Sequence, residues 1–369
     1  TIRDIRQVMV INREQVDGVA LQDQADVGIS AGPGQLNVAL STRREHLPAL
    51  IALVADLLQH PSLPPEVLEE VRRQALAGID AQRKEPEAVL AEAMSRHGDP
   101  YPVGDVRHAR SFDETVADWQ AVQVDRVKAF HQRFVSAAHA EFAAVGDFDV
   151  EAVRQALTQA FGAWRKDEAY ARVPDPLVPV PATRIVLRTP DKQNATMSVR
   201  LSLPLSDRDA DYPALMLANH LLGGGGDSRL WNRIRERDGL SYGVYSTVQW
   251  NPLEANSEWS ATAIFAPQNR DKVDSAFREE IDRALKQGFT QAEFESGKRG
   301  LLSFRRLGRA QDARLAAAWA SNLYLGRDFA VSARVDEQLQ ALSLEQVNAA
   351  LRRHIQPSQF VTGFAGDFK

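Results

Sequence analysis

The chain has 369 residues, which is enough for two or three domains that each bury a core. It contains 44 basic and 49 acidic residues, giving a net charge of −5, and this balance does not favour a polyanionic partner such as nucleic acid. No apolar run reaches about 18 residues, so we expect no membrane span. The absence of cysteine excludes disulfides, thiolate metal sites and a cysteine nucleophile, and it leaves the compartment open.

The first part of the chain predicts a hairpin followed by several helices. Residues 2–20 are compatible with a short helix. Two β-rich stretches, 25–30 and 35–40, flank the turn sequence Ala-Gly-Pro-Gly and predict a β-hairpin. Helices are expected at residues 44–59, 64–84, 86–97 and 123–136. A strand should follow the last helix and end at Gly146-Asp147-Phe148, because Gly-Asp is turn chemistry.

A proline-rich stretch at residues 166–183 separates two parts of the chain. Its four prolines remove backbone donors and fix φ, so the stretch cannot form a helix or a central strand. We expect a semi-rigid, extended linker between a first unit, residues 1–165, and a second unit, residues 184–369. A long surface loop within one domain is the alternative reading.

The second part has a clearer layout of strands and helices. Strands are expected at residues 184–189 and 195–203, and a helix at 209–222. A shorter helix at 228–237 should end at Asp238-Gly239. The remaining expected elements are two antiparallel strands at 242–250 and 257–265, four helices within 269–355, and a final strand ending at Gly366-Asp367-Phe368.

The two parts resemble each other in sequence. Residues 122–148 align without a gap with residues 342–368, at a constant shift of 220, and both segments end in Gly-Asp-Phe. We therefore predict an α+β fold of two homologous units, each a mostly antiparallel sheet covered on one face by helices. The first unit shows no counterpart of residues 182–222. We expect it to be N-terminally incomplete, with the other strands supplied by another chain or by upstream sequence.

The segment from Leu222 to Tyr242, LGGGGDSRLWNRIRERDGLSY, contains an Arg and a Tyr seven residues apart. A turn at Gly239 would fold Arg235 and Tyr242 toward one cleft. Taken alone, this spacing is a weak signal, because a solvated helix arginine and a packed tyrosine explain it more readily than a shared site. The segment resembles the motif of the C-terminal half of insulinase/pitrilysin-type zinc peptidases, and the order of the surrounding segments matches that half over nearly the whole chain.

The resemblance implies roles for individual residues. In that family a helix of the N-terminal half carries His-x-x-Glu-His, with two zinc ligands and a general base. The C-terminal half closes over the peptide. By resemblance, Arg235 binds the substrate carbonyl and Tyr242 stabilises the oxyanion. Gly224, Gly225, Ser228 and Arg229 belong to the same motif and are the candidate substrate-binding residues, although Ser228 and Arg229 also fit a structural role.

The glycine run, Gly223–Gly226, also invites a phosphate-loop reading. No Gly-Lys-Ser/Thr follows it, so the phosphate-loop pattern is not met. We interpret the run as a flexible loop at the rim of the cleft, acting as a hinge or a substrate gate.

The sequence predicts no zinc site in this chain. None of its eight histidines stands in His-x-x-Glu-His or its inverse. By resemblance, the third ligand position falls about eight residues before Pro86, on Gly78, which cannot bind metal. Glu70 and Asp80 on the same helix are typical of solvated charges. His220 lies on the helix that corresponds to the zinc helix, but a lone histidine is more typical of packing.

These observations lead to three functional hypotheses. The first is the substrate-binding half of a zinc metalloendopeptidase, whose zinc lies in the complete enzyme and not on this chain. The second is a non-catalytic scaffold or peptide-binding subunit. The third is a peptide-capturing chaperone that adds a strand to an exposed sheet edge. The expected partners are a peptide or unfolded protein as substrate, and a metal-bearing N-terminal half or partner subunit; a second copy of the chain is an alternative partner.

Overall fold

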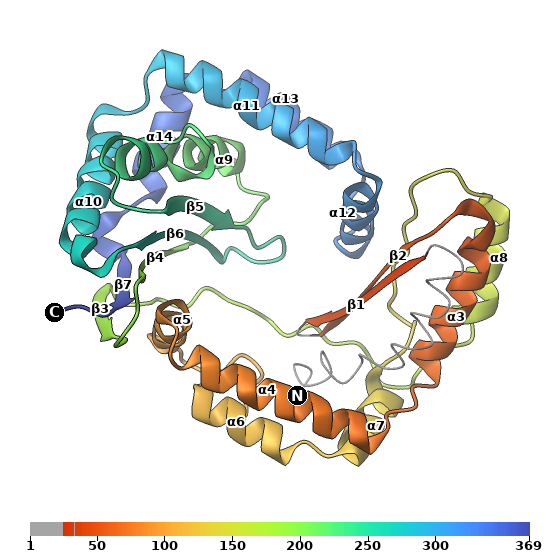
Figure 1. Ribbon diagram of the computed structural model, residues 1–369. Helices are drawn as coiled ribbons and strands as arrows, with labels where there is room; N and C mark the ends of the chain where they lie inside the picture. The colour runs from red at the N-terminus through yellow and green to blue at the C-terminus, as the bar shows by residue number, and fades with distance from the viewer. Residues whose placement is uncertain (1–24, 33) are drawn as a thin grey trace. The chain divides into compact units, whose positions relative to one another are not determined.

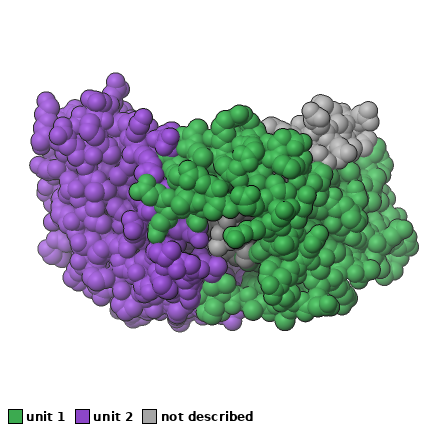
Figure 2. All heavy atoms as spheres, turned by 90° about the horizontal axis from the view of Figure 1, so that it is seen from below, with its two compact units in different colours: residues 1–79, 113–174, 311–324 green, residues 80–112, 175–310, 325–369 purple. Residues whose placement is uncertain are grey.

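The structure, a computed structural model, describes residues 25–32 and 34–369, and the helix expected at residues 2–20 lies outside them. The chain divides into two compact units, coloured separately in Figure 2. Unit 1 contains the described residues up to Ile79, then Asp113–Pro174 and Gln311–Tyr324. Unit 2 contains Asp80–Phe112, Asp175–Ala310 and Leu325–Lys369. Each unit therefore draws on separate parts of the sequence.

Unit 1 contains the predicted hairpin. Strands β1 (Asp26–Gly32) and β2 (Gln35–Ser41) pair antiparallel from Gly32↔Gln35 outward (Figure 1), which confirms the prediction. Gly34 has a φ of 71°, a conformation that glycine adopts without strain. Apolar side chains alternate along both strands and pack toward the buried residues of α3 (Leu47–Gln59).

Helices complete unit 1. Helix α8 (Val150–Phe161) packs beside α3, and His131 on α7 (Val124–Phe134) lies 2.7 Å through its Nε2 from the carbonyl oxygen of Leu58. The other helices with residues in unit 1 are α4 (Pro65–Gln82), α6 (Phe112–Ala121) and α12 (Asp312–Tyr324), together with the 3-10 turn η1 (Arg44–His46).

The strand expected before Gly146-Asp147-Phe148 is not formed, and this prediction is wrong. The chain from Val135 to Asp149 contains no strand, whereas its sequence counterpart in unit 2 is β7 (Val361–Gly366). Strand β7 is held between two neighbours, β3 and β4. In the described part of unit 1, β1 and β2 pair only with each other, so no neighbouring strand offers backbone partners to residues 139–147.

The proline-rich stretch contains no helix or strand between Asp167 and Ala182, as its prolines predict. Strand β3 begins directly after it, at Thr183.

Unit 2 is built on a five-stranded, mostly antiparallel sheet in the order β3-β7-β4-β6-β5. Strands β3 (Thr183–Arg188) and β7 pair parallel, and all other pairs are antiparallel. The remaining strands are β4 (Ala195–Leu203), β5 (Gly243–Gln249) and β6 (Ser257–Phe265). The α+β class with a mostly antiparallel sheet is thus confirmed for this unit.

One face of this sheet carries the main core. Helices α9 (Tyr212–Asn219), α10 (Arg270–Gln287) and α14 (Leu344–His354) lie on that side (Figure 1), and Trp259, Phe265 and Phe364 are fully buried. The remaining helices of the unit are α11 (Gln291–Arg309), α13 (Ala330–Ala341), the π-helices η2 (His220–Gly224) and η3 (Trp231–Arg237), and the 3-10 turns η4 (Pro267–Asn269) and η5 (Pro357–Gln359).

The C-terminal part contains five α-helices, α10 to α14, and not the four that we predicted. Helix α11 ends at Arg309 and α12 begins at Asp312.

Helix α5 (Pro86–Arg96) covers part of the opposite face of the sheet. Its Leu90 and Met94 are buried against Val361 and Ala365 of β7, whereas Phe364 points to the main core. Gly363 makes this contact close, because a Cβ placed there would lie 2.4 Å from the Cδ1 of Leu90. The sheet of unit 2 is therefore covered on both faces, and the second cover comes from a segment that precedes the proline-rich stretch.

Candidate functional site

Arg235 and Tyr242 lie on either side of one tight turn. Arg235 belongs to η3, where the N–H of Asp238 donates to the carbonyl oxygen of Arg233 at 3.2 Å, a bond that spans five residues. Gly239 follows with a φ of 60°. The N–H of Leu240 then donates to Ile234, and the chain enters β5 directly after Tyr242. Short π-helical segments are rare and are often found at functional sites.

Both side chains are open to solvent. The side chain of Arg235 is 42% exposed, and Tyr242 is 69% exposed. Arg235 and Tyr242 share no hydrogen bond. The closest carboxylate oxygen to Arg235 is Oε1 of Glu236, at 3.4 Å from its Nη1. Both polar groups thus remain available to an incoming ligand.

The backbone at Tyr242 is held firmly although its side chain is exposed. Its N–H donates to the carbonyl oxygen of Ile264 on β6 at 2.9 Å. The buried hydroxyl of Ser241 lies 2.6 Å from the carbonyl oxygen of Gly243 and 2.7 Å from that of Ile264, and it accepts the N–H of Gly243. Ser241 therefore fixes the chain on both sides of Tyr242.

Arg235 also has a support within its own helix. Its guanidinium carbon lies 5.2 Å from the centroid of the Trp231 ring. Sequence reasoning missed both Trp231 and Ser241. The signal for Trp231 was its place four residues before Arg235, since side chains at that spacing meet on one side of a helix.

The glycine run is packed and is not the free loop that we expected. Gly223 and Gly224 lie within η2, and a Cβ on Gly223 would lie 2.4 Å from the hydroxyl oxygen of Ser246 on β5. A Cβ on Gly225 would lie 3.0 Å from the ring of His220. These glycines allow η2 to approach β5 closely. Gly224 and Gly226 are exposed, so the run still reaches the surface.

Ser228 and Arg229 lie inside unit 2. Ser228 is 2% exposed. Arg229 donates from Nε and Nη2 to both carboxylate oxygens of Glu293, at 2.7 and 2.8 Å, and from Nη2 to the carbonyl oxygen of Gly288. Burial alone would raise the pKa of Glu293, but hydrogen bonds from Arg229 and Thr290 lower it to about 2. Arg229 thus ties the segment that leads into η3 to α11, and both residues have structural roles outside the proposed site.

The described residues do not fit a zinc ion. Residues 25–32 and 34–369 contain no group of three or more His, Asp or Glu side chains arranged to hold a metal, while a catalytic zinc uses three protein ligands. His220 is packed between Gly225 and Gly300, and burial lowers its pKa. Gly78 is an exposed residue of α4. Zinc chemistry therefore has no ligand set in this part of the chain.

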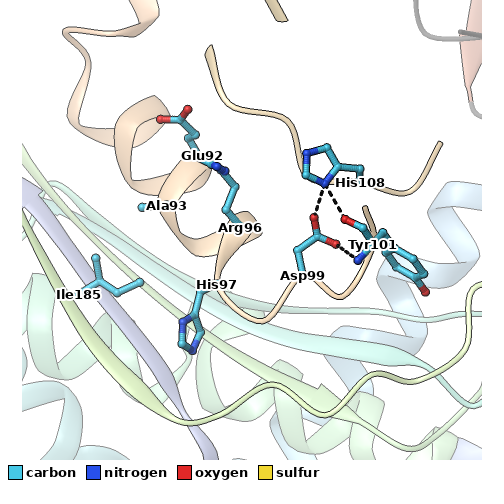
Figure 3. Close-up of a pocket in the computed structure, with 8 residues that line it drawn as sticks. All are labelled: Glu92, Ala93, Arg96, His97, Asp99, Tyr101, His108 and Ile185. Carbon is cyan, nitrogen blue, oxygen red and sulfur yellow. Dashed lines mark hydrogen bonds and ion pairs between the residues drawn. The ribbon is translucent and has the colours of Figure 1, made fainter. Parts of the chain in front are cut away.

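Unit 2 also contains a cavity of about 570 Å³ beside the C-terminal end of α5. Figure 3 shows the carboxylate of Asp99 directed at His108, with a separation of 2.9 Å to Nδ1. Asp99 also accepts the backbone N–H groups of Tyr101 and Ala109. These bonds order the loop after α5.

Comparison with known proteins gives a family match for part of the chain. Residues 121–301 match the family described as peptidase M16 inactive domain. An uncharacterized zinc protease of Mycobacterium tuberculosis is 25% identical over 322 residues, which are 83% of this chain and 69% of the relative. These matches confirm the resemblance to a zinc peptidase and to its half without metal.

Two further proteins are similar to this chain over most of its length. A non-peptidase homolog of Helicobacter pylori is 20% identical over 340 residues, 90% of this chain and 75% of the relative. The crystal structure of a peptidase M16 inactive domain from Pseudomonas fluorescens has a TM-score of 0.80 at 23% identity, covering 96% of this chain and 83% of that one.

None of the helices within residues 25–32 and 34–369 combines the length and the apolar character of a membrane span.

Proposed function

We propose that this chain is the substrate-binding half of a zinc-dependent metalloendopeptidase that acts on peptides. In this proposal Arg235 and Tyr242 face a cleft whose zinc and general base belong to another unit or another chain. The guanidinium of Arg235 binds a carbonyl oxygen of the substrate. The hydroxyl of Tyr242 donates to the oxygen that becomes negative in the transition state, a role suited to a phenol.

The observation that carries the proposal is the combination of a fixed backbone and free side chains in the turn from η3 to β5. Tyr242 is 69% exposed, yet hydrogen bonds anchor the chain at Ser241 and Gly243 on either side of it. An exposed tyrosine on a rigid backbone loses little further freedom when it binds a ligand. The M16 inactive-domain match supports the same assignment.

The proposal requires a metal-bearing partner. The described residues lack a ligand set for zinc, so the metal, the water that it activates and the general base come from a second half of the enzyme. The partner is therefore an M16 unit with His-x-x-Glu-His, either in the same polypeptide or in a separate subunit. The substrate is a peptide or an unfolded protein.

Reconstitution tests this function. The full chain is mixed with a metal-bearing M16 unit that contains His-x-x-Glu-His, and hydrolysis of a fluorogenic peptide is measured with and without the chain. We expect hydrolysis only in the mixture, with kcat/KM lowered in Tyr242→Phe. Equal activity of the metal-bearing unit alone and of the mixture would remove the catalytic role.

A non-catalytic peptide-binding or scaffold subunit is the second candidate. The similarity to a non-peptidase homolog of Helicobacter pylori favours it, as does the absence of a zinc ligand set among the described residues. It predicts that the chain binds its partner and unfolded polypeptide, while Arg235→Gln and Tyr242→Phe leave the rate of the assembly unchanged.

A further inference from the structure

We propose that Trp231 is a positioning residue that holds Arg235 in its substrate-binding conformation. This inference rests on the proposed function of Arg235. Trp231 and Arg235 both belong to η3, and the guanidinium carbon of Arg235 lies 5.2 Å from the centre of the indole ring. A cation within about 6 Å of a tryptophan ring is attracted by the negative face of the π-system.

The spacing of Trp231 and Arg235 brings the two side chains together. They are four residues apart in η3, and side chains at this spacing lie on the same side of a helix. The guanidinium of Arg235 lies over the ring of Trp231, 5.2 Å from its centroid.

Arg235 needs such a support because little else restrains it. Its side chain is 42% exposed and its nearest carboxylate contact, to Glu236, is 3.4 Å long. Other arginines of the same helix are held differently: Arg233 is paired with Asp238 and with Glu279, and Arg237 with Asp238. An exposed arginine has high rotamer entropy, which a ligand must remove on binding. The indole face restricts that freedom beforehand and leaves the N–H groups at the rim of the guanidinium free to donate.

A double-mutant cycle tests this role on the full chain. The probe is fluorescein-labelled β-casein, an unfolded polypeptide, and its affinity is measured by anisotropy for the wild type, Trp231→Leu, Arg235→Gln and the double variant. We expect Arg235→Gln to weaken binding about tenfold or more. Trp231→Leu should weaken it about two- to fivefold, the size of an exposed cation–π contact. In the Arg235→Gln background, Trp231→Leu should have no further effect.

Two further variants show whether Trp231 acts by orienting Arg235 or only by stabilising the fold. Trp231→Phe keeps an aromatic face beneath Arg235 and should bind close to wild type even if Trp231→Leu is less stable. Phe304→Leu on α11 is the matched control, because this aromatic side chain is 63% exposed and lies on another helix than Arg235. Its affinity should equal that of the wild type.

The outcomes distinguish the two proposals. If Arg235→Gln binds as tightly as the wild type, the function proposed for Arg235 is wrong and the role of Trp231 falls with it. If Arg235→Gln weakens binding while Trp231→Leu does not, only the positioning role is wrong. An equal loss from Trp231→Leu in both backgrounds would also overturn it, because the indole would then act without Arg235.

Discussion

The side-chain oxygen of Asn219 accepts a hydrogen bond of 2.9 Å from the indole Nε1 of Trp259, which is fully buried in the sheet of unit 2. The same oxygen accepts the hydroxyl of Ser246 at 2.7 Å. One amide at the end of α9 therefore satisfies donors from β6 and β5. This bond network joins the helix that leads into the glycine run to the strand that follows Tyr242.

We predict that Asn219→Leu destabilises the protein by about 2–4 kcal/mol, because it leaves two buried donors without an acceptor. Urea unfolding followed by tryptophan fluorescence measures this loss. Asn37→Ala, at an exposed position of β2, should change the free energy of unfolding by less than about 0.5 kcal/mol. A stable Asn219→Leu variant would mean that the network contributes nothing.

Gly363→Ala should destabilise unit 2 by about 1–3 kcal/mol, because its methyl group would overlap Leu90 and Met94 of α5. The double variant with Leu90→Ala should lose less stability than the sum of the two single variants, because the shorter side chain makes room for the methyl group. Gly78→Ala is the contrasting control: no atom lies within 4 Å of its Cβ position and it sits inside α4, so stability should rise by about 0.5–1 kcal/mol. Thermal unfolding of the variants gives the comparison. Equal melting temperatures for Gly363→Ala and the wild type would show that α5 does not pack closely on β7.

Tyr242→Phe should lower kcat/KM of the reconstituted peptidase about 100-fold, the usual loss for one oxyanion donor. The melting temperature should not change, because the hydroxyl makes no hydrogen bond within the described part of the chain. Tyr245→Phe is the matched control on β5, where the side chain is 56% exposed, and its kcat/KM should equal that of the wild type. If Tyr242→Phe and Tyr245→Phe have equal kcat/KM values, the proposed role of Tyr242 is refuted.

The ion pair of Glu293 and Arg229 should make the stability of the protein decrease at acid pH. The pKa of Glu293 is lowered to about 2, below the value near 4.3 of an unfolded chain. The pair therefore stabilises the protein fully above about pH 4.5, and this contribution is lost as the pH falls toward 2. Melting temperatures of the wild type and Glu293→Gln should differ most at pH 6 and converge near pH 2.5. A difference that stays constant over this range would contradict the assignment.

The sequence alone indicated the resemblance to zinc peptidases, proposed Arg235 and Tyr242 as site residues, and predicted most elements of unit 2. The predicted elements depend on local chemistry. The hairpin β1–β2 follows from alternating side chains on both sides of a glycine-rich connection, and the end of η3 follows from Asp238-Gly239.

Tertiary structure decided what depends on distant partners. Residues 139–147 carry the sequence of a strand, but they form none, because a strand exists only where a neighbour offers hydrogen bonds. The glycine run looked like a hinge from its composition, yet Ser246 on β5 and His220 require glycine there for close packing. The same holds for Trp231 and Arg235: their spacing is visible in the sequence, while the contact between the guanidinium and the indole ring is seen only in the folded chain.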